Sequence, residues 1–358
     1  MRKRLLIGTA SLAVVLLLLA ALFGDRLLLR VMQRQASSML SGESFAQYAD
    51  GLNLVLCGSG SPMPDPTRAG PCVAVIAGSR IFIVDVGSGS VRNLARAGLP
   101  AGRVEALLLT HFHSDHIDGL GELMLQRWAG GGRDTPLPVH GPDGVESVVA
   151  GFNQAYGHDF RYRVAHHGPD VVPPQGAGGV AHAFAIPESG EGHVVLEAEG
   201  LRVTAFAVDH APVEPAVGYR FDYRGRSLVI SGDTVKSENL AKFAQGVDLL
   251  VHEALAIHLV DVVTAGAREA GARNMEQITL DIHNYHTTPV QAAELAQAAG
   301  VRHLLYYHIV PALPLRRLET LFLDGVDEVY DGPVTLGRDG TWIQLREGST
   351  EVRVRRRG

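Results

Sequence analysis

The stretch Thr110-His111-Phe112-His113-Ser114-Asp115-His116 decides the fold, because it gathers three imidazoles and a carboxylate within six residues. The apolar run before it, Ala106–Leu109, has the length and composition of a β-strand. Side chains of an extended segment point to the same side every two residues, so His111 and His113 face one way. The chain then turns into a helix, which brings Asp115 and His116 back toward the same point. We therefore predict a metal site at the end of this strand.

Further candidate ligands follow later predicted strands. His210 follows Val203–Val208, Asp233 follows Leu228–Ser231, and His308 follows Leu304–Tyr307. A lone histidine or aspartate after a strand is more often structural than ligating. Together, however, these three residues and the first motif supply enough ligands for two metal sites, which favours the ligand interpretation for each of them.

Short apolar runs alternate with glycine-rich turns along the chain, and this order predicts a layered α/β domain at residues 51–358. We expect strands at Leu52–Cys57, Val73–Ile76, Arg80–Val86, Ala106–Thr110, Leu201–Ala207, Val217–Tyr223, Ser227–Ser231, Leu249–Val251 and His303–Tyr307. We expect helices at Val91–Ala97, Gly119–Trp128, Gly144–Ala155 and Thr288–Ala299. The turn-rich stretch His158–His193 is expected to be a surface excursion over the core.

An internal echo relates two hairpins of the domain. Val73–Gly87 has the form strand, turn, strand and Asp85, and Val217–Thr234 repeats this form and ends in Asp233. The echo predicts that the two aspartates face the same interior edge.

The composition describes a chain that can bury a core. The 358 residues are 46% hydrophobic and 20% charged, which excludes a disordered tail, and two cysteines are too few for a disulfide-knit mini-protein. The net charge of −6 excludes a global basic field for nucleic acid. The basic cluster Arg353–Arg357 is interpreted as a solvated tail.

The N-terminus predicts a membrane anchor at residues 1–24. Basic residues precede an apolar run, Leu5–Gly24, that is long enough to cross a bilayer as a helix. The positive-inside tendency then places the body outside the cytoplasm, and a cleaved secretory signal is the alternative. Residues 25–50 are expected to form a juxtamembrane helix, Leu27–Met39, and a short linker, Ser41–Asp50.

Export would allow a disulfide between Cys57 and Cys72, which lie on neighbouring predicted strands. Two separate buried thiols explain the same two residues equally well.

These motifs resemble the metallo-β-lactamase superfamily, and within it the ribonuclease Z and arylsulfatase-like branch. The resemblance covers about Leu52 to Pro314. The matching pieces are Leu56–Pro62, Val84–Gly87, His111–His116, Gly218–Arg220, Ser231–Thr234, Val251–Ala254, His286–Thr288 and His308. It implies a four-layer αββα sandwich with a dinuclear zinc site on one edge of the two sheets.

The resemblance also assigns ligands. One zinc ion would be held by His111, His113 and His210, and the other by Asp115, His116 and His308, with Asp233 as the bridge. Zinc suits this mixture of imidazole and carboxylate, and manganese or iron is compatible with the same ligand types. Asp85 would orient a ligand histidine, although a strand-end turn residue is nearly as good an interpretation.

The family implies a mechanism in which a metal-bound hydroxide attacks an anionic ester. Asp115 would orient or deprotonate the water. His286 would help to protonate the leaving oxygen, and Glu253 would orient His286. Ordinary structural roles at helix starts explain His286 and Glu253 as well, and His283 could take the place of His286.

We expect a hydrolase for a phosphodiester or for a sulfate or phosphate ester. A small anionic substrate is favoured over nucleic acid, because the chain is acidic and shows no basic arm. The alternatives are a lactonase, a β-lactamase and a non-catalytic, membrane-anchored metal-binding protein. A homo-oligomer is expected.

Overall fold

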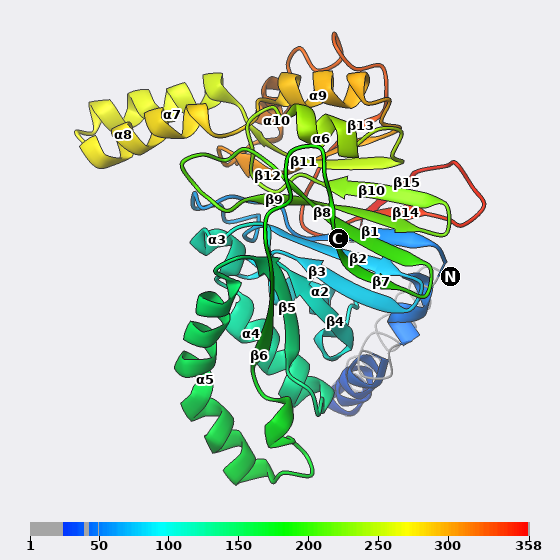
Figure 1. Ribbon diagram of the computed structural model, residues 1–358. Helices are drawn as coiled ribbons and strands as arrows, with labels where there is room; N and C mark the ends of the chain where they lie inside the picture. Colours follow the sequence, from blue (N-terminus) through cyan, green and yellow to red (C-terminus); the bar gives the residue numbers. More distant parts are fainter. Residues whose placement is uncertain (1–23, 39–42, 49, 357–358) are drawn as a thin grey trace, which may run out of the picture.

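The computed structural model describes residues 24–38, 43–48 and 50–356. Two β-sheets pack face to face, and helices cover both outer faces (Figure 1). The α/β sandwich predicted from the sequence is therefore confirmed.

The first sheet has eight strands, and its central strands come from the first third of the chain. In spatial order they are β15 (Arg353–Arg356), β14 (Thr341–Leu345), β1 (Leu52–Gly58), β2 (Cys72–Ala77), β3 (Arg80–Val84), β4 (Val104–Leu108), β5 (Leu137–Pro142) and β6 (Gly179–Phe184).

The second sheet has seven strands from the C-terminal half of the chain. In spatial order they are β13 (Val334–Leu336), β12 (Leu304–Val310), β11 (Leu249–Leu255), β10 (Arg226–Ile230), β9 (Val217–Tyr223), β8 (Leu201–Ala207) and β7 (His193–Ala198).

Helices form the outer layers. On the first sheet these are α2 (Ser90–Arg96), α4 (Leu120–Leu125) and α5 (Val145–His167), and on the second sheet α6 (Glu238–Phe243), α9 (Pro289–Ala298) and α10 (Arg316–Phe322). The short helix α3 (Ser114–Ile117) lies at one edge of the sandwich, and α7 (Ile257–Glu269) and α8 (Arg273–Asp281) form a hairpin that projects at the same edge (Figure 1).

Alternating side chains divide the core into layers, because successive residues of a strand point to opposite faces of its sheet. In β1, Leu54 and Leu56 pack between the two sheets, whereas Val55 and Cys57 face the helices of the first sheet. This alternation explains why the central strands β1 and β2 are buried along their whole length: both of their faces are covered.

The predicted strands are confirmed, with shifts of a few residues at their ends. The predicted helix start at Thr288 is also confirmed, because this residue caps α9 in a capping box with Gln291. The internal echo corresponds to real geometry. In each half an antiparallel hairpin, β2–β3 or β9–β10, is followed by a parallel neighbour, β4 or β11.

The predicted excursion His158–His193 lies largely at the surface, but the prediction that it is made of turns is wrong. Its first ten residues continue α5 to His167, and the rest contains β6 and the start of β7. The outer half of α5 carries few apolar residues, so it lacks the periodicity that predicts a helix. An ion pair one helical turn apart, Arg163 with Asp159 at 2.7 Å, supports the helix there.

Several further elements were not predicted, namely helices α6, α7, α8 and α10 and strands β5, β13, β14 and β15. The basic cluster Arg353–Arg357, interpreted as a solvated tail, contains strand β15, which pairs with β14. Alternation is hard to see in β15 because arginines dominate its sequence.

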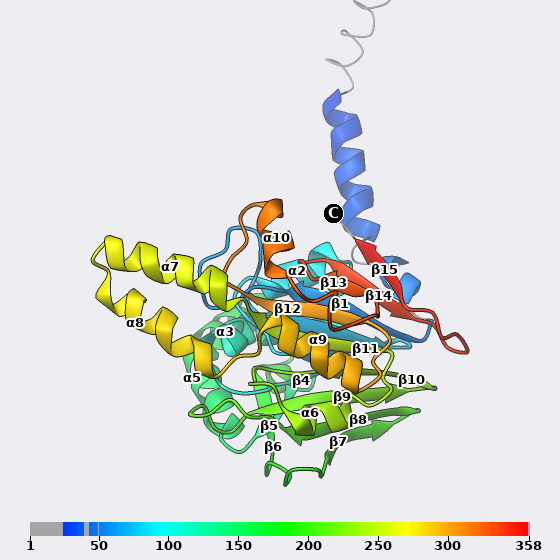
Figure 2. The ribbon, with the colours of Figure 1, turned by 90° about the horizontal axis from the view of Figure 1, so that it is seen from above.

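The predicted membrane segment, residues 1–24, lies outside the described residues except for Gly24. Residues 24–38 are helical, and the helix points away from the body in a different direction from the α7–α8 hairpin (Figure 2). Among the parts of the chain that the structure describes, no helix has the length and apolarity needed to cross a membrane.

The predicted linker Ser41–Asp50 instead contains a 3₁₀ helix, Glu43–Tyr48, that packs on the body. The hydroxyl of Tyr48 donates to the carbonyl of Ala97 at 2.8 Å, and its ring contacts that of Trp342. This segment therefore belongs to the folded domain.

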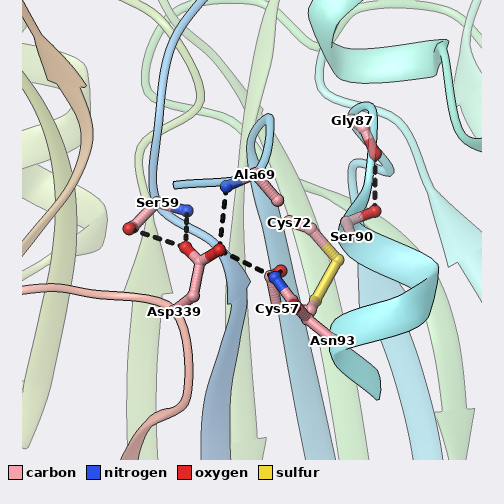
Figure 3. The surroundings of a disulfide bond; sticks show 8 residues. All are labelled: Cys57, Ser59, Ala69, Cys72, Gly87, Ser90, Asn93 and Asp339. Carbon is pink, nitrogen blue, oxygen red and sulfur yellow. Dashed lines mark hydrogen bonds between the residues drawn. A yellow bond between two sulfur atoms is a disulfide. The ribbon is translucent and has the colours of Figure 1, made fainter. Parts of the chain in front are cut away.

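Cys57 and Cys72 form a disulfide between β1 and β2, which decides between the two interpretations of these residues (Figure 3). The bond closes the loop that joins these two strands.

Asp339 holds the same loop from the other side (Figure 3). Its carboxylate accepts hydrogen bonds from the backbone of Ser59 and Ala69, at 3.0 and 2.8 Å, and from the side chain of Asn93 at 2.7 Å. The loop of residues 58–71 is thus fixed at both of its ends.

Candidate metal centre

The histidine-rich motif lies where the two sheets meet at one edge. β4 ends at Leu108, the chain continues through Thr110, and α3 begins at Ser114. The amide of Val217, at the start of β9, donates to the carbonyl of Thr110 at 2.9 Å. The motif of the first sheet is therefore joined directly to the second sheet, which carries the later candidate ligands.

The seven predicted ligands converge. The first group consists of His111, His113, His210 and Asp233, and the second of Asp115, His116 and His308; within each group the potential ligand atoms lie within 4.8 Å of one another. His111 Nε2 lies 3.0 Å from His113 Nδ1, and His308 Nε2 lies 3.3 Å from Asp115 Oδ2.

Asp233 stands between the two groups. Its Oδ2 atom lies 3.3 Å from the Nε2 atoms of both His116 and His308, and 3.8 and 4.0 Å from those of His111 and His210. Gly232, with φ of 63°, makes the turn that directs Asp233 into this position. One carboxylate thus faces imidazoles of both groups.

Polar atoms without partners show that these residues fit a cation. His116 Nε2 and Asp233 Oδ1 are buried and have no hydrogen-bond partner. A buried polar atom left in this way is costly, and a nitrogen and carboxylate donor set is one that zinc and similar divalent ions accept. The residues present are therefore compatible with bound divalent metal.

Asp85 orients two of the histidines, His116 directly and His111 through Thr110. Its Oδ2 accepts from His116 Nδ1 at 2.8 Å, and its two oxygens accept from the backbone and the hydroxyl of Thr110, each at 2.8 Å. The same hydroxyl lies 3.0 Å from His111 Nδ1. These contacts direct Nδ1 of both imidazoles toward Asp85 and Thr110 and leave Nε2 toward the centre.

Sequence reasoning missed two supporting groups. Thr110 stands in the motif itself, and its hydroxyl next to a ligand histidine could have been recognised. The other is the backbone carbonyl of Tyr285, which accepts from His210 Nδ1 at 2.9 Å. A backbone contact between residues 75 positions apart leaves no signal in the sequence.

The structure brings His286 to the site and leaves His283 outside it. His286 lies within 4.8 Å of Asp233 and His308, measured between potential ligand atoms, whereas His283 lies 3.8 Å from Asp261 of α7. Buried Glu253 approaches His286 Nδ1 to 3.1 Å through the same oxygen that accepts from the amide of Thr287. The predicted pair of Glu253 and His286 is therefore assembled beside the candidate ligands.

Comparisons with known proteins identify the family. The family profile described as "Beta-lactamase superfamily domain" matches residues 80–309. Ribonuclease Z of Mycobacterium avium (strain 104) is 38% identical over 296 residues, which cover 82% of this chain and 98% of that protein. The chain belongs to the β-lactamase superfamily. The resemblance inferred from the sequence, including its ribonuclease Z branch, is confirmed, and the protein is a metal-dependent hydrolase.

Solved structures of the β-lactamase superfamily share the fold. The metallo-β-lactamase fold protein YhfI from Bacillus subtilis aligns with a TM-score of 0.58 and 18% identity, covering 82% of this chain and 99% of that one. The short form of human tRNase Z aligns with a TM-score of 0.56 and 22% identity, covering 82% and 98%. These likenesses support the sandwich architecture of the present superfamily member.

The histidines of the two ligand groups have pKa values that are shifted in opposite directions. Burial lowers the pKa of His111 well below its ordinary value and also lowers the pKa of His113 and His210. These three imidazoles are therefore neutral near pH 7, with a lone pair free for a cation.

In the second group, nearby carboxylates together change the pKa values of the histidines more than burial does. Burial alone would lower the pKa of His116 and of His308, but Asp233 and Asp115 raise both pKa values above the ordinary one. Conversely, burial would raise the pKa of Asp233, but His308 and His116 lower it well below its usual range. The carboxylates thus keep a negative charge that attracts cations.

A cavity of about 260 Å³ opens above the centre. His113, Asp115, Asp233, His286 and His308 form its polar floor. Its other sides come from the loop after β1, the α8 segment and the end of β12. A small substrate therefore has direct access to the candidate ligands from solvent.

Proposed function

We propose that this protein is a dinuclear zinc phosphodiesterase. The observation that carries the proposal is the position of Asp233, whose Oδ2 atom faces histidines of both ligand groups. A carboxylate shared in this way suits two cations held side by side. The relative from M. avium is named a ribonuclease, which favours a phosphodiester over the sulfate ester, lactone and β-lactam considered from the sequence.

The proposed ligands are His111, His113 and His210 for one ion, and Asp115, His116 and His308 for the other, with Asp233 between them. Bound divalent ions would lower the pKa of water to near neutrality and stabilise the negative charge that builds on the phosphoryl oxygens. Two Zn²⁺ ions exceed the charge of the two carboxylates, so the centre would attract an anionic ester.

The chain's own residues have distinct roles in this proposal. Asp115 lines the cavity and orients the attacking water. His286 directs Nδ1 to Glu253, and the imidazolium form of this ring would give its Nε2 proton to the leaving oxygen and become the neutral imidazole. Glu253 is fixed by the amide of Thr287, at 2.9 Å, and holds His286 in that orientation. His286 thus acts on the substrate, and Glu253 acts through His286.

RNA is a second candidate substrate, favoured by the name of the M. avium relative. The acidic composition of the chain instead favours a small ester over RNA as the substrate. A structured RNA and a small phosphodiester assayed on the same preparation separate the two.

We further propose that Leu5–Gly24 anchors the protein in a membrane and that the body lies outside the cytoplasm. The apolar run supports the anchor. The Cys57–Cys72 disulfide supports an oxidising compartment. Protease added to the outside of membrane vesicles or cells whose plasma membrane is intact should digest the body, and complete protection of the body would contradict this orientation.

The function is tested on full-length protein purified in mild detergent. We expect close to two metal ions per chain by elemental analysis and metal-dependent cleavage of bis(p-nitrophenyl) phosphate. An aryl sulfate, a lactone and a β-lactam serve as comparison substrates and should be cleaved more slowly. A well-folded protein that holds no metal and cleaves no phosphodiester would refute the proposal.

A further inference from the structure

One side of the cavity above the metal centre is apolar. It is formed by five side chains, here called the apolar wall, that come from three separate segments. They are Met63 of the loop after β1, Met275 and Ile278 of α8, Ile282 just after α8, and Val310 at the end of β12.

The apolar wall is supported from behind. Met63, Ile282 and Val310 pack with Leu255 and Val260 in a small hydrophobic cluster that is separate from the three larger cores. The loop that carries Met63 is closed by the disulfide at its base. The inner part of the apolar wall is therefore held in place by core packing and by the disulfide.

Two side chains of the wall, Met275 and Ile278, lie on α8 of the α7–α8 hairpin, which projects from the body (Figure 2). The hydroxyl of Thr264 in α7 donates to that of Thr279 in α8 at 2.8 Å, and both groups are buried. Nearer the tip, Arg268 and Glu276 form an ion pair at 2.6 Å. These contacts hold α8 against α7, and α8 lines the cavity.

Two residues of the wall are open to solvent. Met275 is 39% exposed and Ile278 is 53% exposed, one helical turn apart on α8. Exposed apolar side chains that line a cavity beside a polar centre fit a ligand with both kinds of surface.

The cavity lacks the groups that hold a polynucleotide. None of its lining residues, all within the described part of the chain, is a lysine or an arginine. Proteins bind nucleic-acid backbones mainly through lysine and arginine, which neutralise the phosphates. A single anionic ester would be neutralised by the metal centre alone, and the wall offers the rest of the ligand only apolar contacts.

We propose that the substrate is an ester with an apolar organic group, about the size of one aromatic ring, which packs on the apolar wall. This inference rests on the proposed function, since the ester itself must reach the metal centre. The cavity of about 260 Å³ has room for both parts, because an apolar cavity of about 150 Å³ already holds benzene.

Calorimetry with phosphonates tests the wall without requiring turnover. Phenylphosphonate and methylphosphonate carry the same anionic head and differ only in the organic group, and inorganic phosphate has none. On full-length, zinc-loaded protein we expect phenylphosphonate to bind about tenfold more tightly than methylphosphonate, because the ring buries more apolar surface. We also expect a negative heat-capacity change for the phenyl compound.

Variants on α8 locate the effect. Ile278→Asn, and separately Met275→Gln, should reduce the phenyl-to-methyl preference to less than about threefold, since each removes apolar contact area from the wall. Both positions are exposed, so circular dichroism should stay native. Leu280→Asn is the matched control, because Leu280 is 42% exposed on the same helix but does not line the cavity. It should keep the preference of the natural chain, and phosphate affinity should be unchanged in all three variants.

The outcomes separate the two proposals. Equal affinity for the two phosphonates, or a preference that survives both wall variants, would overturn the apolar group while leaving the phosphodiesterase intact. A short RNA that binds more tightly than phenylphosphonate and is insensitive to Ile278→Asn would overturn it as well. Loss of the preference in Leu280→Asn would mean that the whole helix, and not the wall, was responsible. Absence of metal and of phosphodiester cleavage would instead count against the proposed function itself.

Discussion

Two hairpins in opposite halves of the molecule end in aspartates that meet at one imidazole. Asp85 follows the β2–β3 hairpin of the first sheet, and Asp233 follows the β9–β10 hairpin of the second. Asp85 lies 2.8 Å from Nδ1 of His116, and Asp233 lies 3.3 Å from Nε2 of the same ring. The same local architecture thus supplies two carboxylates with different surroundings.

The carboxylates of Asp85 and Asp233 differ in the hydrogen-bond partners of their oxygens. Both oxygens of Asp85 accept hydrogen bonds from Thr110 or His116, so this carboxylate is saturated by the protein. Asp233 Oδ1 has no partner, and Oδ2 faces a ring of imidazoles. A saturated carboxylate can only orient its neighbours, whereas an unsaturated one has electron pairs left for a cation.

Asp233→Ala should have the largest effect. Removing the carboxylate shared by both groups should lower kcat/KM for bis(p-nitrophenyl) phosphate by at least about 10³-fold, because an interaction with both ions is lost. Metal content should fall below two ions per chain by elemental analysis.

Circular dichroism of Asp233→Ala should stay close to native, which separates loss of the centre from loss of the fold. Full activity in this variant would show that Asp233 is not the shared ligand and would remove the contrast with Asp85.

His286→Gln tests a second pair of a carboxylate and an imidazole. Glu253 contacts Nδ1 of His286 in the way that Asp85 contacts Nδ1 of His116. A general acid contributes about 10²–10⁴-fold where the leaving oxygen needs a proton. We expect a loss in this range for an alkyl leaving group and a much smaller loss for p-nitrophenolate, measured as kcat at saturating substrate. Equal losses with both leaving groups would argue that His286 only positions other residues.

Asp85→Asn should have a smaller effect than either. Asparagine tolerates the left-handed backbone of this position, where φ is 55°. It lacks the charge that fixes His116, so metal affinity measured by chelator competition should fall by about 10–100-fold. Activity should return at high zinc concentration. A variant that zinc does not restore would place Asp85 among the ligands themselves.

Thr110→Val should have the smallest effect. Valine keeps the shape of threonine but removes the hydroxyl between Asp85 and His111, and it leaves the backbone amide that also binds Asp85. We expect a loss of about 1 kcal/mol in the free energy of unfolding and a fall in metal affinity of a few fold, smaller than in Asp85→Asn. An effect equal to that of Asp85→Asn would mean that the hydroxyl, and not the carboxylate, controls the histidines.

The metal centre was predictable because its signals are local. Each candidate ligand stands at the end of an apolar strand, and the repeated hairpin form indicated that Asp85 and Asp233 share an edge. Their convergence at the edge is borne out by the distances around Asp233. Their roles as ligands stay predictions.

The remaining features were not predictable for physical reasons. The outer half of α5 and strand β15 contain few apolar residues. Their sequences therefore lack the periodic apolar pattern that predicts a helix or a strand. The carbonyl of Tyr285 acts through the backbone, which carries no residue signature. The apolar wall joins residues such as Met63 and Ile278 that only the tertiary fold brings to one cavity.

The division of the ligands between the two sheets has a consequence for maturation. The first sheet and α3 supply His111 to His116, while His210, Asp233 and His308 come from the second sheet, so neither half can coordinate the cation pair before the halves dock. Metal capture would therefore be a late event in biogenesis, and the proposed ions would then fasten the two layers at that rim. Stripping them with a chelator should speed amide hydrogen exchange along this rim while the strands at the opposite end stay protected.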